Sequence, residues 1–444
     1  MSAGRAPVPT LREALDEARR AAPPRGALVA ISGRVDAGPR PMPEPAAACA
    51  DGERWQLFDA RLASSLAPAA LLAIGEMASV RAEGAGRVAS IAAESAALFD
   101  AIASFGPLSA RLVGGAGFEL GSAVELSLPR ILIADEGDAR SVIMVLRAEE
   151  LERPDALLAE LAARLEPRSA PSASPSGAGL VDDGAAAFRS AVAAALAAIE
   201  AGRLEKVVVA RSLVVAARTS AAVLVARLAG LEATVRIGRA GFGPSDWVAA
   251  TPELLAERAG ERVRSEALAG SCPRSGDDSA ERAALLASDK ERREHELVAL
   301  GIEAAFREVG LEPRRGEIEL RSLRSVHHLR TGIDASSPRA PSALELAGRL
   351  HPTPAMGGVP RDEALAFIAE HEARPRGPYA APFGWVDARG DGVFVVGIRG
   401  AEIGAEHVVL RAGTGIVRGS SIDAELAETD AKLAAMRAAL ELGA

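Results

Sequence analysis

Apolar positions recur at two spacings along this chain, and the two spacings predict two kinds of element. Residues 11–21, 154–165 and 185–202 carry apolar side chains about every three or four positions, which is typical of amphipathic helices. Short apolar runs such as ALVAISGRV, ARLVGGAGFEL and RILIADE lie between Gly- and Pro-containing turns and are typical of strands. The first half of the chain therefore mixes helices with strands.

The second half repeats this mixture in an irregular order. Helices are expected over residues 279–309, as one long helix, and over 361–372 and 422–442. Strands are expected at LEKVVVARSLVV, VHHLRTGI, PFGWVDA and VFVVGIRG. Because strands and helices do not alternate regularly, the pattern predicts an α+β fold built on antiparallel sheets. The segment 167–184, PRSAPSASPSGAGLVDDG, is rich in Ser, Pro and Gly and is expected to form an exposed loop.

Composition narrows the class of protein. The 444 residues are 49% hydrophobic and 25% charged, enough for a large core, and the net charge of −9 argues against nucleic-acid binding. No stretch approaches the ~20 apolar residues of a membrane span, and the first residues lack the apolar core of a signal peptide. Cys49 and Cys272 lie too far apart in sequence to suggest a disulfide framework, so both are expected to be inert buried thiols. These features predict a cytoplasmic protein without membrane or nucleic-acid partners.

Lysine is rare in this chain. Lys and Arg together number 51, yet Lys206, Lys290 and Lys432 are the only lysines, and Tyr379 is the only tyrosine. Where arginine is the ordinary cation, a lysine is expected at positions that need a compact or removable charge. A biased composition could also leave three lysines at arbitrary positions.

Two pairs of carboxylates have the spacing of one helix face. Glu291 and Glu294 are three residues apart, as are Glu425 and Glu428, with Lys432 four residues further on. Two such helices could converge on Mg²⁺, which prefers oxygen ligands. Taken by itself, the spacing fits solvated helix faces better.

An acid, a base and two glycine-bearing segments are further candidates. Lys206 lies in a strand among valines, where loss of hydration favours the neutral amine that can accept a proton, unless the polar side of the strand faces water. Glu253, in TPELLAER, could be a general acid if buried, or could cap a helical turn. The segments LAGS (268–271) and AGTGIV (412–417) can offer backbone amides to a carboxylate, although short glycine motifs are weak signals.

Taken in order, these segments resemble the chorismate-utilising enzymes. The matching pieces are EKVVVARS, ATPELL, EALAGS, LLASDKERREHELV, HHLRT, LHPTPAMGGVP, RGPYAAPFGW, DGVFVVGIR and AGTGIVRGSSIDAELAETDAKL. They cover about 240 residues, from Lys206 to the C-terminal end. GGAGFE, near Gly114, resembles the less distinctive N-terminal half of the family. All three lysines and the single tyrosine fall within matched motifs.

Within this family the chain is most similar to the isochorismate synthases. Members that add ammonia generally lack a lysine at the position of Lys206 and carry an FPAGT-like segment in place of HPTPA, and salicylate synthases also depart from HPTPA. The alternatives are a salicylate synthase, an aminating enzyme with a glutaminase partner, or a non-catalytic binder of the same fold. Val393 is the only indication of a non-catalytic binder, because the family often has an acidic residue at that position. The resemblance fits menaquinone biosynthesis and catecholate siderophore biosynthesis alike, and RGPYAAPFGW modestly favours the menaquinone type.

The resemblance implies a fold and an activity. The fold would be a large sandwich of two antiparallel sheets flanked by helices. Residues 1–184 would complete the sandwich, and 185–444 would be the chorismate-binding catalytic region. The activity would be Mg²⁺-dependent conversion of chorismate to isochorismate by a monomer that needs no protein partner.

The resemblance also implies roles for particular residues. Lys206 would deprotonate the attacking water, and Glu253 would protonate the leaving hydroxyl. Glu294 and Glu428 would bind Mg²⁺ directly, and Glu291 and Glu425 would act through water. The residues implied to bind the substrate are Gly270, Ser271, His328, Thr331, Tyr379, Arg399, Gly413, Thr414, Gly415 and Lys432.

Overall fold

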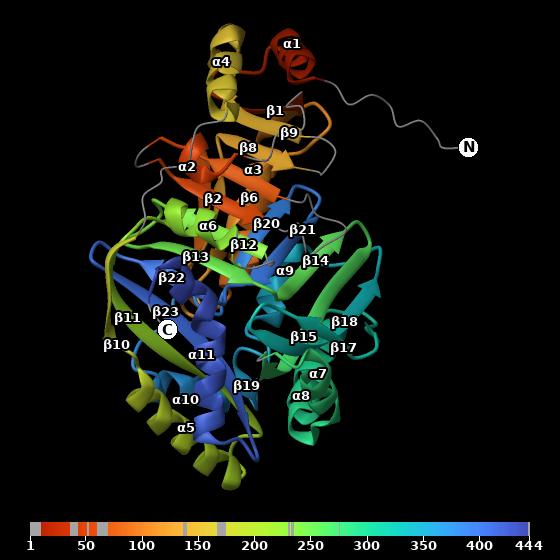
Figure 1. Cartoon of the computed structure of the whole chain (residues 1–444). Coiled ribbons are helices and arrows are strands. Elements are labelled where there is room, and N and C mark those ends of the chain that lie inside the picture. The colour runs from red at the N-terminus through yellow and green to blue at the C-terminus, as the bar shows by residue number, and fades with distance from the viewer. Residues whose placement is uncertain are drawn as a thin grey trace.

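Two β-sheets, each extended by strands from both halves of the chain, form the body of the protein (Figure 1). The computed structural model describes residues 10–35, 43–50, 53–59, 70–135, 140–166, 175–229, 231, 235–274 and 276–442. Within them, the 13-stranded first sheet runs β10 (Ser176–Asp182), β11 (Lys206–Arg218), β23 (His407–Val417), β22 (Gly400–Ile403), β13 (Asp246–Thr251), β12 (Val235–Ala240), β2 (Trp55–Asp59), β3 (Ala70–Ile74), β8 (Ile131–Asp135), β9 (Arg140–Arg147), β1 (Leu28–Val35) and β5 (Ile102–Phe105), with β19 (Gly358–Val359) beside β11.

The 10-stranded second sheet is assembled mostly from the second half of the chain. Its order is β16 (Arg314–Arg315), β18 (Val326–Ser336), β15 (Arg262–Pro273), β14 (Leu254–Ala259), β21 (Gly392–Val396), β20 (Pro382–Asp387), β6 (Arg111–Ala116), β7 (Val124–Leu128) and β4 (Ala78–Ala82), with β17 (Glu319–Ser322) beside β18. The predicted α+β sandwich of antiparallel sheets is confirmed, with one local exception. β1 and β5 run parallel to each other, at the edge of the first sheet.

Strands from the two halves of the sequence are hydrogen-bonded neighbours in both sheets. In the first sheet β2 pairs with β12, and in the second sheet β6 pairs with β20. The division of the chain at residue 184 stays a prediction.

The first sheet is covered on both faces, which explains its nearly continuous apolar strands. Phe58 and Leu71 belong to the core that the two sheets share, whereas their neighbours Leu57 and Leu72 belong to a second core. Successive side chains of a strand point to opposite faces, so a strand buried on both sides must be apolar throughout. Helices that contribute to the second core include α1 (Leu11–Ala21), α4 (Pro154–Leu165), α6 (Ala221–Ala229) and α11 (Ile422–Ala439).

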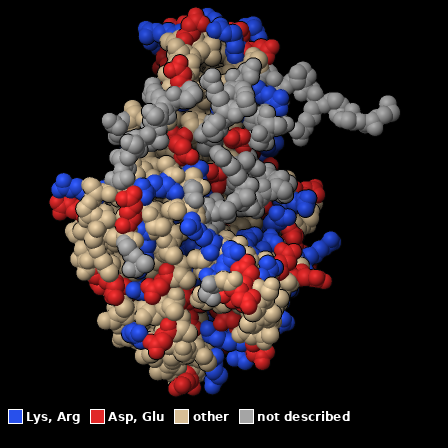
Figure 2. All heavy atoms as spheres, in the orientation of Figure 1, with Lys and Arg blue, Asp and Glu red and all other residues tan. Residues whose placement is uncertain are grey.

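The remaining helices lie around the shared core. They are α3 (Arg87–Asp100), α5 (Ala185–Glu200), α7 (Asp278–Ala287), α8 (Asp289–Glu308), α9 (Ala343–Leu350) and α10 (Arg361–His371) (Figure 1). The exception is the short helix α2 (Pro45–Ala48), which packs against α4 and α6 beside the second core. None of the helices described is long and apolar enough to cross a membrane. Figure 2 shows acidic and basic side chains interspersed over the visible face.

The helix expected over residues 279–309 is in fact two helices, so that prediction was wrong. Ser288 has an extended backbone between α7 and α8, and its side-chain oxygen accepts a hydrogen bond from the Glu291 amide. A serine in this conformation caps a new helix start more favourably than it continues an old one. The break at Ser288 sets the direction in which Glu291 and Glu294 leave α8.

The loop expected over residues 167–184 was also wrong in part. Residues 167–174 lie outside the described residues, but 176–182 form β10, which pairs with β11. The side chains of β10 are mostly exposed, so main-chain hydrogen bonds hold it in place and its apolar pattern is weak. Sequence periodicity detects such an edge strand poorly because periodicity reports burial.

Candidate functional site

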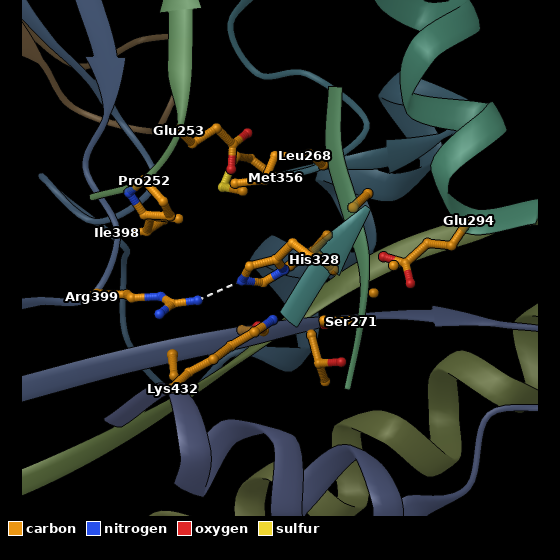
Figure 3. Close-up of a pocket in the computed structure, with 18 of the residues that line it drawn as sticks. Pro252, Glu253, Leu268, Ser271, Glu294, His328, Met356, Ile398, Arg399 and Lys432 are labelled. Carbon is orange, nitrogen blue, oxygen red and sulfur yellow. Dashed lines mark hydrogen bonds between the residues drawn. The ribbon is translucent and has the colours of Figure 1, made fainter. Parts of the chain in front are cut away.

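A cavity lies between the two sheets where β11 and β23 face β15 and β18. Figure 3 shows Glu253, Glu294, Arg399 and Lys432 reaching it from different elements. The predicted site residues that line it are Glu253, Gly270, Ser271, Glu294, His328, Tyr379, Arg399, Gly413, Thr414, Gly415 and Lys432. The predicted residues outside this lining are Lys206, Thr331, Glu291, Glu425 and Glu428, and each of them contacts a residue described below.

Glu253 is a buried acid in the short connection between β13 and β14. Its side chain is almost fully enclosed, and burial raises the pKa of Glu253 to about 8, with the nearby negative charge of Glu266 adding to the effect. Glu266 is held by Arg321 at 2.6 Å and by Arg330 at 2.7 Å, so its charge is well compensated. Glu253 therefore carries a proton near neutral pH, as a general acid must.

Arg399 and His328 form a polar wall of the cavity. The Arg399 guanidinium donates to His328 Nε2 at 2.6 Å (Figure 3). Burial lowers the pKa of His328 well below its usual value, and the positive charge of Arg399 lowers it further, so the imidazole is neutral. Arg399 has a φ of 54°, an uncommon backbone conformation for a residue with a side chain, and such conformations concentrate at functional sites.

The three lysines pair with the four predicted metal-binding glutamates. Lys206 Nζ lies 2.9 Å from Glu294 Oε1, and Lys432 Nζ lies 2.7 Å from Glu428 Oε1. Lys290, to which the sequence assigned no role, lies 3.0 Å from Glu291 and 2.8 Å from Glu425. The rarity of lysine was the available signal for Lys290. The predicted quartet is thus a cluster of carboxylates spaced by ammonium groups and not a solvated helix face. These seven residues are called the lysine–glutamate cluster below.

Burial and nearby charges act on the carboxylates of this cluster in opposite directions. Burial by itself would raise the pKa of Glu428, but Lys432 and the hydrogen bond from Ser271 outweigh burial and lower it. Burial raises the pKa of Glu291, and the negative charge of Glu294 adds to that effect.

Ser271 links the cluster to the cavity through a bulge in β15. Gly270 has a φ of +77°, and a side chain at this position would meet the Glu291 carbonyl at 2.8 Å. The pairing of β15 with β18 shifts register here. Ser271 then donates its amide to Glu291 at 2.9 Å and its hydroxyl to Glu428 at 2.7 Å. Gly270 of the LAGS segment is therefore needed for the bulge. The Ser271 amide binds the carboxylate of Glu291 in this structure.

The AGTGIV segment of β23 forms the wall opposite this bulge. Lys432 donates to the Gly413 carbonyl at 2.8 Å, and the Thr414 hydroxyl donates to Glu425. A side chain at Gly415 would meet Glu294 Oε1 at 2.1 Å, so only glycine leaves room for this carboxylate. The glycines here provide space for charged side chains.

Thr331 lies outside the cavity lining and is hydrogen-bonded to His295. His295 Nδ1 donates to the Ala269 carbonyl at 3.0 Å, which leaves Nε2 to accept from the Thr331 hydroxyl at 2.8 Å. Burial lowers the pKa of His295, in agreement with a neutral ring. His295 was not predicted from the sequence, although it belongs to the REHELV motif.

The enclosed space is small. It measures about 50 Å³, whereas small-molecule sites commonly offer roughly 300 Å³ or more. A ring-shaped ligand therefore requires the lining side chains to move, and Lys432 and Met356 are long, flexible members of that lining. A larger hollow of about 640 Å³ beside α3 and α9 is mostly apolar and lacks any of the predicted site residues.

Comparison with known proteins identifies the family. A family profile described as "Chorismate binding enzyme" matches residues 47–441. The chain belongs to the chorismate-binding enzymes.

Relatives of this chorismate-binding enzyme are similar over much of its length. The salicylate biosynthesis isochorismate synthase of Pseudomonas aeruginosa is 37% identical over 366 residues, which is 76% of this chain and 75% of that protein. Isochorismate synthase EntC of Escherichia coli is 41% identical over 191 residues, which is 42% of this chain and 49% of EntC. The solved structure of MenF, the menaquinone-specific isochorismate synthase of Escherichia coli, superposes with a TM-score of 0.76 at 24% identity and covers 97% of this chain and 99% of MenF. That similarity shows a common fold.

Proposed function

We propose that this chorismate-binding enzyme is an isochorismate synthase that uses Mg²⁺ and the residues of the cavity. The observation that carries the proposal is a buried, protonated Glu253 at the cavity together with a buried Lys206 that is ion-paired with Glu294. Isochorismate synthases among its relatives support the choice of reaction.

The donor chemistry of the lysine–glutamate cluster fits Mg²⁺. All four candidate ligands are carboxylates, the oxygen donors that this hard cation prefers, and all four are largely buried. We assign Glu294 and Glu428 as direct ligands and Glu291 and Glu425 as residues that act through water. When bound, Mg²⁺ would supply positive charge next to the substrate carboxylate.

The reaction requires a base and an acid on a substrate held between them. In the proposed step, Lys206 takes a proton from water as the oxygen of that water bonds to the ring carbon beside the carboxylate-bearing carbon. The ring double bonds shift, and the hydroxyl on the far side departs with the proton of Glu253 as water. One water enters and one leaves, so the product is an isomer of chorismate. Each of the two proton transfers is expected to contribute ~10²–10⁴-fold in rate.

The other predicted residues would hold the substrate in this position. Arg399 and Lys432 carry positive charge for its carboxylates, and Tyr379 offers a hydroxyl whose pKa burial raises, so that it stays a donor. His328, being neutral, can line the ring without adding charge. The remaining walls would be shaped by Gly270, Ser271, Gly413, Thr414 and Gly415. Thr331 would contribute indirectly, through its hydrogen bond to His295.

The pathway and the setting stay predictions. The RGPYAAPFGW segment favours menaquinone biosynthesis, and siderophore biosynthesis is the alternative. Action as a cytoplasmic monomer without a protein partner is likewise predicted from the sequence.

Product analysis tests the proposal. The whole chain is incubated with chorismate and Mg²⁺, and the products are separated by chromatography. Isochorismate, formed only when Mg²⁺ is present, is the expected product. Salicylate with pyruvate would indicate a salicylate synthase, and an amino product formed only with ammonia would indicate an aminating enzyme. Unchanged chorismate would indicate a non-catalytic binder, and each of these three results overturns the proposal.

A further inference from the structure

A second cluster of metal-binding side chain types lies outside the cavity, where α7 covers the ends of β15 and β18. Asp278, Glu281 and His327 each offer a ligand atom, and these atoms all lie within 4.8 Å of one another. Among the residues described, this is the only group of three His, Cys, Asp or Glu side chains with such spacing. The cluster includes His327, which has no role in the proposed reaction. Its neighbour in the chain, His328, lines the cavity.

The distances in this cluster are longer than hydrogen bonds. His327 Nε2 lies 3.6 Å from Asp278 Oδ1 and 3.5 Å from Glu281 Oε2, whereas N–H···O bonds span roughly 2.7–3.2 Å. Two ligands of a tetrahedral ion with bonds of about 2.0–2.1 Å lie about 3.3 Å apart. The observed separations are therefore close to those of ligands around a small cation.

His327 is an unsatisfied polar group directed at the two carboxylates. Its side chain is fully buried, with an exposed fraction of 0%, and its Nε2 has no hydrogen-bond partner. Its Nδ1 is 2.8 Å from the Ser322 hydroxyl, on the neighbouring strand β17. Histidine ligands of metals are commonly oriented in this way, through the ring nitrogen that does not bind the metal.

The two carboxylates are also held in place. Asp278 and Glu281 lie three residues apart in the first turn of α7, so they leave one face of the helix. Arg274 donates to both oxygens of Asp278 at 2.7 Å, which fixes this carboxylate although the positive charge works against a cation. Asp278 is half exposed, so the cluster can be reached from solvent.

We propose that His327, Asp278 and Glu281 bind a divalent transition metal of the zinc class. A set of one imidazole and two carboxylates suits such a metal, whereas the four carboxylates of the lysine–glutamate cluster suit Mg²⁺. Three protein ligands leave one tetrahedral position for water. Cys272, the cross-strand partner of His327, is not included, because burial and the charge of Glu281 raise the pKa of its thiol to about 11.

Calorimetry with Zn²⁺ tests this site independently of the chorismate reaction. The whole chain is titrated with Zn²⁺ in the presence of excess Mg²⁺, which keeps a hard-cation site occupied. One equivalent of Zn²⁺ should bind, and His327→Gln should weaken binding at least ~100-fold because one of three ligands is lost. His407→Gln, which changes an exposed histidine on β23, is the matched control and should bind as the unchanged chain does.

A second variant is needed because His327 is buried and His327→Gln could weaken Zn²⁺ binding by disturbing the fold. Asp278→Asn alters a half-exposed residue and should weaken Zn²⁺ binding at least ~10-fold while preserving the melting temperature in chelator. Two results overturn the proposal. If the unchanged chain binds no Zn²⁺, the three side chains only pack against one another and form no metal site. If binding survives His327→Gln but not Glu294→Gln, the metal lies in the lysine–glutamate cluster.

Discussion

Two buried groups of charges border the cavity, and they are constructed differently. In one, Arg376 is fully enclosed and donates to the Glu372 carboxylate and to the main-chain oxygens of Met356 and Val208. In the other, Lys206 and Lys432 each pair with one glutamate and Lys290 pairs with two. Met356 and Val208 also line the cavity, so the arginine group lies directly behind the site.

The two groups differ in what their cations can do: the arginine group holds the main chain in place, and the lysine group can take part in the reaction. A guanidinium has five donors in a fixed fork and stays charged, so the Arg376 group fixes the positions of the main chain around it. An ammonium is a compact charge that can be replaced by another cation and can lose its proton. The chain has 51 basic residues, and all three of its lysines lie in the lysine–glutamate cluster. There, replacement of an ammonium by a metal ion, or loss of its proton, would be useful. Exchanging lysine and arginine in each group is therefore the sharpest way to test the comparison.

The largest expected effect is that of Lys206→Arg. Arginine keeps the charge but stays protonated, so turnover should fall at least ~100-fold while chorismate binding changes less. Isochorismate formation at saturating Mg²⁺ and chorismate measures this. Because Gly415 leaves little room beside Lys206, thermal melting of the variant serves as the control for folding. Turnover near that of the unchanged enzyme would exclude the base role.

Glu253→Gln should reduce turnover by a similar or slightly smaller factor, about 100-fold, because glutamine cannot donate the proton. The pH profile gives an independent test. The pKa of Glu253 is raised to about 8, so the acid is protonated below that pH and is lost as the pH rises through it. The unchanged enzyme should lose activity above about pH 8 through this group, and the residual activity of Glu253→Gln should lack that limb. An identical alkaline limb in both proteins would assign it to another residue.

The metal assignment predicts a graded effect within the lysine–glutamate cluster. Glu294→Gln or Glu428→Gln should weaken Mg²⁺ binding about 100-fold and chorismate binding with it, because a ligand charge is lost. Glu291→Gln or Glu425→Gln should cost about 10-fold, since an intervening water can reorganise. Calorimetric Mg²⁺ titration with and without chorismate measures both. Full activity of Glu294→Gln at limiting Mg²⁺ would show that the cluster is not the metal site.

The smallest effect on turnover is expected from Arg376→Lys, the exchange in the opposite direction. Lysine keeps the charge but cannot reach Glu372, Met356 and Val208 together, so unfolding free energy should fall by about 2–4 kcal/mol. Turnover of the folded protein should change less than about 10-fold. Denaturant unfolding and steady-state kinetics check the two parts, and a loss of turnover as large as that of Lys206→Arg would remove the distinction between the groups.

Much of the fold was predictable because its signals are local. Helices α1 and α4 begin and end at the residues predicted from the spacing of apolar side chains, and the sandwich followed from the resemblance of the motifs. The break at Ser288 was missed because a serine inside an Ala- and Glu-rich helical pattern gives little sign of capping. The strand β10 was missed because it is held by the main chain and its side chains are exposed.

Many of the residues that line the cavity were predictable from the motifs, but most of their contacts were not. Motifs indicated Glu253, Glu294 and Lys432, which line the cavity. The pairing of Lys432 with Glu428 follows from their i,i+4 spacing. The pairings of Lys206 with Glu294 and of Lys290 with Glu425 depend on how β11, α8 and α11 pack, which no spacing along the chain records. The same holds for Glu266, whose charge near Glu253 arises from the pairing of β15 with its neighbours. Val393, the position that suggested a non-catalytic protein, is buried in β21 opposite Trp385.

The central claim is that the cavity adds water at one ring carbon and removes a hydroxyl from another. Running the reaction in water enriched in heavy oxygen tests this directly, with mass spectrometry of isochorismate taken at early times. We expect one heavy oxygen in each new isochorismate molecule, located at the carbon beside the one that bears the carboxylate. Isochorismate that forms without heavy oxygen would mean that the original hydroxyl migrates, and that result would contradict the roles assigned to Lys206 and Glu253.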